Sequence, residues 1–117
     1  MTVGLPRFAV VVGLLLTLNA CGAGSASAPV PTGPPESYPQ AQIDMGHELY
    51  RTTCQACHGA EGQGGVGLPL VGITARKPIE EHRAIVSGGR GTMPPFGASL
   101  TPEEIEAVIA YERATFG

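Results

Sequence analysis

Hydrophobic and polar residues are distributed unevenly along the chain, and their pattern divides it into three parts. Residues 8–18 form an apolar run, FAVVVGLLLTL, that follows the basic residue Arg7. Such a run is too short for a membrane span, which takes about 20 residues, but it is typical of the apolar region of a signal peptide. Residues 21–40 show neither helical nor strand periodicity and are rich in proline. The pattern therefore predicts a signal peptide over residues 1–20, an extended tether over residues 21–40 and a folded domain over residues 41–117.

Within the folded domain, apolar residues at helical spacing predict three helices, and no segment of strand length alternates. The first helix is expected to begin at Asp44, as its cap, and to run toward Cys54. The second is expected over residues 79–87. The last has the clearest start, because Thr101 is followed three residues later by Glu104, and the two form a capping box. Its apolar stripe consists of Ile105, Val108, Ile109 and Phe116. We expect an all-α fold.

The composition limits what this domain can be. The 117-residue chain is 43% hydrophobic with a formal net charge of -3, which is typical of a globular protein and argues against binding to nucleic acid. Its 17 glycines and 11 prolines indicate long loops. With no tryptophan, three phenylalanines and three tyrosines, so short a chain has difficulty building a core from side chains alone. A buried prosthetic group would solve that problem.

Cys21 completes the sequence Leu18-Asn19-Ala20-Cys21, which resembles the lipobox of bacterial lipoproteins. In a lipobox the cysteine is lipidated and becomes the new N-terminus. The alternative is ordinary cleavage after Ala28, which would release a protein without an anchor. Lipidation also accounts for the odd number of cysteines, three, if the other two are used elsewhere. We therefore expect a lipid anchor at Cys21.

The sequence Cys54-Gln55-Ala56-Cys57-His58 is the attachment signature of c-type haem. The spacing lets the sulfurs of Cys54 and Cys57 reach two vinyl groups of one haem from a single turn of backbone, while His58 directs its imidazole at the iron. A disulfide, a thioredoxin-like redox pair and a zinc site are the alternatives. The disulfide would leave His58 without a role, no βαβ pattern supports the redox pair, and no second pair of zinc ligands follows.

The order of features resembles that of the small bacterial class I cytochromes c, which carry a single haem. The resemblance rests on a helix that leads into the motif, a glycine-rich loop, a short helix, a methionine-proline loop and a C-terminal helix. The two loops contain Gly67-Leu68-Pro69-Leu70 and Gly91-Thr92-Met93-Pro94-Pro95-Phe96. The resemblance implies three to four helices wrapped around one covalently bound haem c.

The resemblance also implies roles for four residues. It makes His58 and Met93 the axial ligands of the iron. It makes the carbonyl of Pro69 the acceptor of a hydrogen bond from Nδ1 of His58, which would fix the imidazole and strengthen it as a ligand. It places Leu70 against the face of the haem.

Met93 is also the best sixth ligand on chemical grounds. A thioether is a soft, neutral ligand that suits haem iron, and two prolines follow Met93 in its loop. Met1 lies in the leader, and Met45 lies in the first helix, where core packing is the simpler role. His47 and His82 are the alternative ligands, and both are expected on exposed helix faces.

An iron that is closed on both sides favours one-electron transfer over catalysis. We expect an exported monomer, anchored in a bacterial membrane and facing the periplasm or the outer side of the cytoplasmic membrane. Its electron donor and acceptor would be exported or membrane-bound redox proteins. The main alternative is a haem-bearing subunit or docking module of a larger membrane oxidoreductase. A ligand-binding haem sensor or small peroxidase and a haem-free thiol protein are further alternatives.

Charged residues are arranged asymmetrically along the domain, with basic residues in its middle and acidic residues on the last helix. Two interpretations stay open: the asymmetry orients a partner, or both groups are solvated surface. The residues are Arg76, Lys77, Arg83 and Arg90, and Glu103, Glu104, Glu106 and Glu112.

Overall fold

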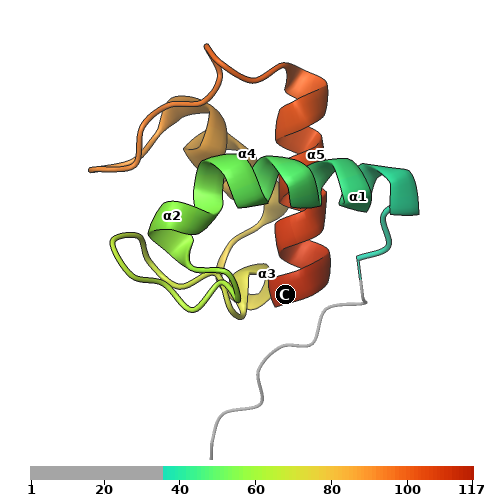
Figure 1. The fold of residues 1–117 in the computed structure, drawn as a ribbon, viewed down its shortest axis with the longest axis horizontal. Coiled ribbons are helices and arrows are strands. Elements are labelled where there is room, and N and C mark those ends of the chain that lie inside the picture. Colours follow the sequence, from blue (N-terminus) through green and yellow to red (C-terminus); the bar gives the residue numbers. More distant parts are fainter. Residues whose placement is uncertain (1–35) are drawn as a thin grey trace, which may run out of the picture.

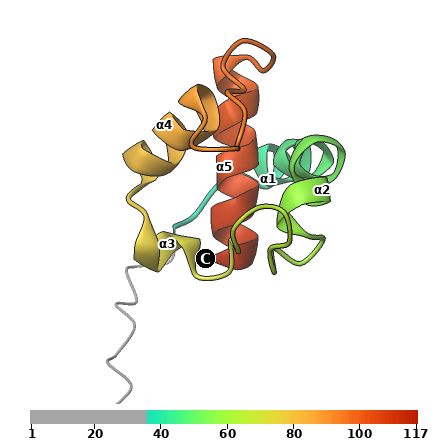
Figure 2. The ribbon, with the colours of Figure 1, turned by 90° about the vertical axis from the view of Figure 1, so that its left-hand side faces the viewer.

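One central helix organises the fold. In the computed structural model, which describes residues 36–117, α5 runs through the middle, and α1 and α4 lie on opposite sides of it (Figures 1 and 2). The elements in chain order are α1 (Gln40–Leu49), the π-helical segment η1 (Tyr50–Cys54), α2 (Gln55–His58), α3 (Ile73–Arg76), α4 (Ile79–Gly88) and α5 (Pro102–Phe116). The all-α prediction is confirmed, with α1, α4 and α5 as the predicted helices and α2 and α3 as single turns.

The predicted leader and most of the predicted tether lie outside the described residues. Cys21 and the alternative cleavage site after Ala28 lie there too. In residues 36–117, no helix is both long enough and apolar enough to cross a membrane. Residues 36–39 precede α1 and lie on the helical body, where Glu36 pairs with Arg113 of α5.

The start of α1 differs from the prediction. The helix begins at Gln40, directly after Pro39, and its first turn has no side-chain cap. The carbonyl of Pro39 accepts hydrogen bonds from the backbone amides of Gln42 and Ile43, at 3.0 and 3.1 Å. Asp44 lies one turn inside the helix, where its carboxylate accepts a hydrogen bond from Gln40 Nε2 at 2.8 Å. The prediction of Asp44 as the cap was wrong, because proline's fixed φ starts the helix earlier.

A close crossing joins α1 to α5. Gly46 of α1 is buried, and a Cβ at that position would lie 1.9 Å from the carbonyl oxygen of Ala107 in α5. Ala107 and Ala110 of α5 are fully buried. These small residues let the two backbones approach closely, and Tyr50, Tyr111 and Phe116 then cluster beside the crossing with ring centroids 5.2–5.6 Å apart.

The start of α5 is confirmed in detail. The amide of Glu104 donates to Thr101 Oγ1 at 3.2 Å, and the amide of Thr101 donates to Glu104 Oε2 at 2.8 Å, which completes the capping box. The predicted apolar stripe is buried: Ile105, Val108, Ile109 and Phe116 are all at most 7% exposed. Around it, Tyr50, Leu70, Ile73 and Val86 complete the core.

Candidate functional site

A cavity of about 480 Å³ opens beside the Cys-x-x-Cys-His segment. Its walls come from α2, the loop over residues 66–70, α3, α4 and the turn over residues 90–93, and Glu112 of α5 also borders it. The volume lies within the range of about 300–1,000 Å³ that is usual for cofactor sites. Most of the lining surface is apolar. Cys57, His58, Pro69, Leu70 and Met93, which the sequence singled out, all border this one cavity.

The imidazole of His58 is held in a defined orientation. Its Nδ1 lies 2.7 Å from the carbonyl oxygen of Leu68, which assigns the ring proton to Nδ1 and leaves the Nε2 lone pair available for a metal. Gly67 allows this approach, because a Cβ there would lie 2.9 Å from both Nδ1 and Cε1 of His58. The Gly67 amide in turn donates to the carbonyl of Cys57 at 2.8 Å, so the loop is fastened to α2.

The predicted role of the Pro69 carbonyl is corrected by this geometry. The acceptor for His58 is the carbonyl of Leu68, one residue earlier. The Pro69 carbonyl instead accepts a hydrogen bond from Arg76 Nη2 at 2.8 Å. The loop turns at Gly67, so that the Leu68 carbonyl faces the His58 imidazole and the Pro69 carbonyl faces Arg76 of α3. Pro69 and Leu70 nevertheless both line the cavity, and Leu70 is 7% exposed.

The two motif cysteines differ in burial. Cys54 lies at the end of η1 and is 8% exposed, whereas Cys57 is exposed at the edge of the cavity, and neither forms a disulfide. Burial raises the pKa of the Cys54 thiol to about 12, which suppresses the thiolate. A thiol held protonated is a poor nucleophile, so this environment disfavours a thiol redox site. Across residues 36–117, no group of three or more His, Cys, Asp and Glu side chains is placed to hold a metal ion.

The loop that carries Met93 is a tight turn. The amide of Met93 donates to the Arg90 carbonyl at 3.0 Å, and the amide of Arg90 donates to the Met93 carbonyl at 3.1 Å. The turn requires glycine at Gly89, where φ is +74° and a Cβ would lie 2.7 Å from the Met93 carbonyl oxygen. Met93 is half-buried and borders the same cavity as His58.

The other two histidines do not occupy comparable positions. His47 of α1 is exposed and stacks on Tyr111 with ring centroids 5.0 Å apart, and it does not line the cavity. His82 of α4 does line the cavity, but it is 3% exposed and its Nε2 lies 2.8 Å from Glu112 Oε2. The prediction that His82 lies on an exposed face was wrong, because α4 packs that face on α5.

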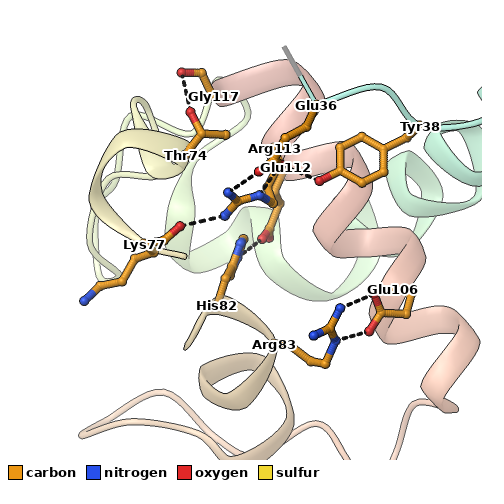
Figure 3. A network of polar contacts seen from close by, with 10 residues as sticks. All are labelled: Glu36, Tyr38, Thr74, Lys77, His82, Arg83, Glu106, Glu112, Arg113 and Gly117. Carbon is orange, nitrogen blue, oxygen red and sulfur yellow. Dashed lines mark hydrogen bonds and ion pairs between the residues drawn. The ribbon is translucent and has the colours of Figure 1, made fainter. Parts of the chain in front are cut away.

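Several charged side chains predicted on the surface are part of a polar network between α4, α5 and the N-terminal segment (Figure 3). Glu112 is 3% exposed and pairs with His82, and Arg83 pairs with Glu106. Arg113, which is 4% exposed, pairs with Glu36 and donates to the Lys77 carbonyl at 2.9 Å. The hydrogen bond from Arg113 lowers the pKa of Glu36 to about 2. The predicted charge asymmetry is therefore partly neutralised inside the domain.

The donor set and the walls of the cavity fit a haem. Cys57 and His58 border one side of the cavity, the loop that carries Met93 borders the same cavity, and most of the lining surface is apolar. Cys54, which does not line the cavity, lies at the end of η1, three residues before Cys57. Arg76, Lys77 and Arg90 border the cavity and offer positive charge to the carboxylates of a haem. Val66 and Leu68 also border it and are 84% and 79% exposed, so they present apolar surface at its mouth.

A helical fold in which this motif and a methionine loop share one cavity defines the small c-type cytochromes. Residues 41–111 match the family model described as "Cytochrome C oxidase, cbb3-type, subunit III", and the chain belongs to this family. It is a class I c-type cytochrome, and haem c is its covalently bound cofactor. The chain spans between about an eighth and a third of the length of the first curated relatives that it matches.

Both a relative of similar length and a much longer relative support this assignment. The chain is 33% identical over 98 residues to "Cytochrome c-551" of Bacillus subtilis, which covers 83% of this chain and 82% of that protein. It is 38% identical over 88 residues to "Alcohol dehydrogenase (quinone), dehydrogenase subunit" of Acetobacter aceti, but it spans only 12% of that much longer protein. Among solved structures, cytochrome c6 from the diatom Phaeodactylum tricornutum matches with a TM-score of 0.55 and 31% identity, over 62% of this chain and 91% of that one.

Sequence reasoning missed Leu68 and Glu112 at this site, and it considered His82 only as an alternative ligand on an exposed helix face. For the last two a signal existed. Glu112 falls on the apolar stripe of α5, seven residues after Ile105, and His82 falls on the same face of α4 as Val86. A polar residue on an apolar helix face indicates a buried, paired group. For Leu68 there was no such signal, because only the turn at Gly67 decides which carbonyl faces His58.

Proposed function

We propose that this protein is an exported, membrane-tethered carrier of single electrons, in which Cys54 and Cys57 bind the haem and His58 and Met93 are its axial ligands. The observation that carries the proposal is the cavity itself. It brings together an imidazole whose ring proton is already directed to Leu68 and a methionine pinned in a tight turn. Histidine and methionine together leave the iron no open position for a substrate.

Each part of the site has a physical role. Bound haem supplies exchange of one electron between ferric and ferrous iron. The hydrogen bond to Leu68 makes the His58 imidazole a stronger ligand, and the thioether of Met93 raises the reduction potential. Leu70, Ile73 and Val86 exclude water from one wall, which disfavours the more positively charged ferric state. The exposed Cys57 side leaves an edge of the site near the surface, where a partner can exchange the electron.

The anchor and the tether complete this proposal. Lipidation of Cys21 would hold the domain at the periplasmic or outer face of the cytoplasmic membrane, where exported or membrane-bound redox proteins are its donor and acceptor. A proline-rich tether is extended, at about 3.1 Å per residue, and lets a monomeric domain reach several partners. Mass measurement of the mature N-terminus tests the anchor: acyl chains on Cys21 support it, and a chain that begins after Ala28 contradicts it.

The ligand assignment is tested with Met93→Ala in the matured protein. We expect this variant to keep its covalent haem but to lose the weak long-wavelength absorption band that reports thioether ligation. The reduced variant should also bind carbon monoxide rapidly, because the position held by Met93 is open. Absorption spectra of the oxidised and reduced protein measure both effects.

Met45→Ala is the matched control. Met45 is 41% exposed on α1 and does not line the cavity, so its removal should leave the band unchanged. If Met93→Ala retains the band, the ligand assignment is refuted. If the wild-type protein releases its pigment into acidified acetone, covalent attachment through Cys54 and Cys57 is refuted.

A second candidate function is a haem-bearing module within a larger oxidoreductase. It is favoured by the match to a dehydrogenase subunit of which this chain spans 12%. The two candidates differ in stoichiometry. A single partner that co-purifies one to one supports the module, whereas an isolated monomer that exchanges electrons with several partners supports the carrier.

A further inference from the structure

His82 and Glu112 form a buried pair at the edge of the haem cavity. His82 comes from α4 and Glu112 from α5, each is 3% exposed, and His82 Nε2 lies 2.8 Å from Glu112 Oε2 (Figure 3). Both residues border the cavity. In the part of the chain that the structure describes, Nδ1 of His82 is the one buried side-chain nitrogen or oxygen without a hydrogen-bond partner. Nothing in the ligation by His58 and Met93 uses this pair.

The pair can exist in two charge states. When Glu112 is ionised and His82 is neutral, the ring proton lies on Nε2, facing the carboxylate, and Nδ1 carries only a lone pair. When the pair holds one more proton, Nδ1 carries a hydrogen in either arrangement, whether Glu112 is ionised beside an imidazolium or protonated beside a neutral ring. The protonation of Nδ1 therefore reports whether the pair is negative or neutral.

The cavity supplies a partner for Nδ1 in the protonated state. A haem bears two carboxylates, and the cavity that His82 borders is also bordered by the basic residues Arg76, Lys77 and Arg90. Arg76 donates to the backbone carbonyls of Pro69 and Val71, both at 2.8 Å, which places its guanidinium beside the loop that forms the wall. A buried donor facing a carboxylate forms a strong, charge-assisted hydrogen bond.

We propose that Nδ1 of His82 binds a haem carboxylate, and that the His82–Glu112 pair takes up a proton when the haem is reduced. Reduction adds one negative charge to a haem held in the cavity that the pair borders, and in a poorly solvated site this charge favours uptake of a proton by the pair. The balance is one electron from the redox partner and up to one proton from water for each iron that passes from ferric to ferrous. On oxidation both leave.

Other charged groups face the pair but do not replace it as the proton acceptor. Arg113 of α5 pairs with Glu36, whose pKa it lowers to about 2, and both stay ionised. Tyr50 and Cys54 of η1 lie close enough to feel the charge of Glu112. Burial raises the pKa of the Tyr50 hydroxyl above its usual range, and the Cys54 sulfur forms a thioether in the matured protein. Arg76, Lys77 and Arg90 also border the cavity, and Lys77 and Arg90 pair with Glu81. Histidine is the side chain that ordinarily changes charge near neutral pH.

The test is the midpoint potential of the matured, full-length protein as a function of pH. In the wild type we expect the potential to fall as pH rises across the range in which the pair loses its proton. In His82→Gln, whose amide still donates a hydrogen bond but does not titrate, most of this dependence should disappear. His47→Gln is the matched control, because His47 is an exposed histidine outside the cavity, and it should keep the wild-type dependence.

Proton uptake on reduction, measured in the wild type with a pH indicator in weak buffer, gives a second readout that needs no variant. Uptake of a sizeable fraction of a proton per electron supports the inference. A potential independent of pH, no proton uptake, or a His82→Gln variant with the wild-type dependence overturns it. The inference rests on the proposed haem site, but the two proposals fail on different results. Absence of the thioether band from the wild-type spectrum refutes ligation by Met93. A midpoint potential that does not change with pH, in a protein that shows the band, refutes only the role of His82.

Discussion

Gly67 sets the geometry of the His58 imidazole. Its missing side chain lets the ring lie against the loop backbone while Nδ1 bonds to the Leu68 carbonyl. The residue types Cys54, Cys57 and His58 were predictable, because their spacing in one turn of backbone is itself the chemical requirement. The acceptor of the His58 hydrogen bond was not predictable. Whether the Leu68 or the Pro69 carbonyl faces His58 depends only on how the chain turns after Gly67.

Gly67→Ala tests this arrangement at the scale of one residue. A Cβ 2.9 Å from His58 has to displace the ring or the loop, and overpacking of this kind costs about 1–3 kcal/mol. We expect a lower unfolding midpoint of the haem-bound protein and a weakened thioether band, measured by thermal unfolding and absorption. Gly65→Ala is the control, since its Cβ would meet the Cys57 carbonyl oxygen at an ordinary 3.4 Å. Equal losses in the two variants would contradict the role of Gly67.

At the scale of elements, helix α5 was predictable and the connection from α1 to α2 was not. The capping box at Thr101 and Glu104 is a local signal, and local hydrogen bonds satisfy it in the fold. By contrast, the π-helical segment η1 leads into the motif and ends at its first residue, Cys54, and the Tyr50 hydroxyl donates a hydrogen bond to the Gly59 carbonyl at 2.5 Å. This connection depends on the burial of Tyr50 against Tyr111 and Phe116 of α5, which no spacing in the sequence predicts.

The crossing of α1 and α5 gives a prediction about packing. Gly46→Ala places a methyl group 1.9 Å from the Ala107 carbonyl oxygen, so the two helices have to separate. We expect a loss of about 3 kcal/mol in the free energy of unfolding, at the upper end of overpacking effects. Denaturant titration monitored by far-ultraviolet circular dichroism measures it.

Gly88→Ala is the matched control for this crossing. Gly88 also lies in a helix, at the end of α4, but a Cβ there would meet nothing within 4 Å. Alanine lowers the entropy of the unfolded chain, so this change should be neutral or should stabilise the protein by about 0.5 kcal/mol. If both variants lose equal stability, close approach of α1 and α5 is not the cause.

At the scale of the whole molecule, the segment before α1 is joined to the last helix by Glu36 and Arg113. The Arg113 side chain is 2% exposed in this pair and that of Glu36 is 34% exposed. This contact joins residues 77 positions apart in the sequence, so no local sequence pattern could predict it. It also explains why residues 36–39 lie on the folded body although their composition is that of a tether.

Glu36→Gln is expected to cost about 1–2 kcal/mol of stability at neutral pH, because it leaves a buried guanidinium with a weaker partner. The folded pKa of Glu36 is lowered from 4.5 to about 2. Its contribution is therefore complete above pH 4.5 and is lost as pH falls toward 2. The difference between wild type and variant, from denaturant unfolding at several pH values, should shrink across that window.

Glu48→Gln serves as the control for this pair. Glu48 and Arg51 form an ion pair on α1 whose side chains are 65% and 56% exposed, and water screens such pairs. The substitution should barely move the unfolding midpoint. A Glu36→Gln variant that behaves in the same way, or a stability difference that persists undiminished at low pH, would contradict the proposed role of Glu36.

Local sequence was enough to identify the covalent attachment motif, the two glycine-bearing loops, the all-helical class and the capped start of α5, because each depends on residues within a few positions of one another. Tertiary packing alone decided that Leu68 faces His58, that His82 and Glu112 are buried together beside the cavity, and that Glu36 is fastened to Arg113. These contacts join segments distant in the chain. Removing their polar and charged groups from water is costly unless each group meets a hydrogen-bonding or oppositely charged partner, and only the folded chain brings those partners together.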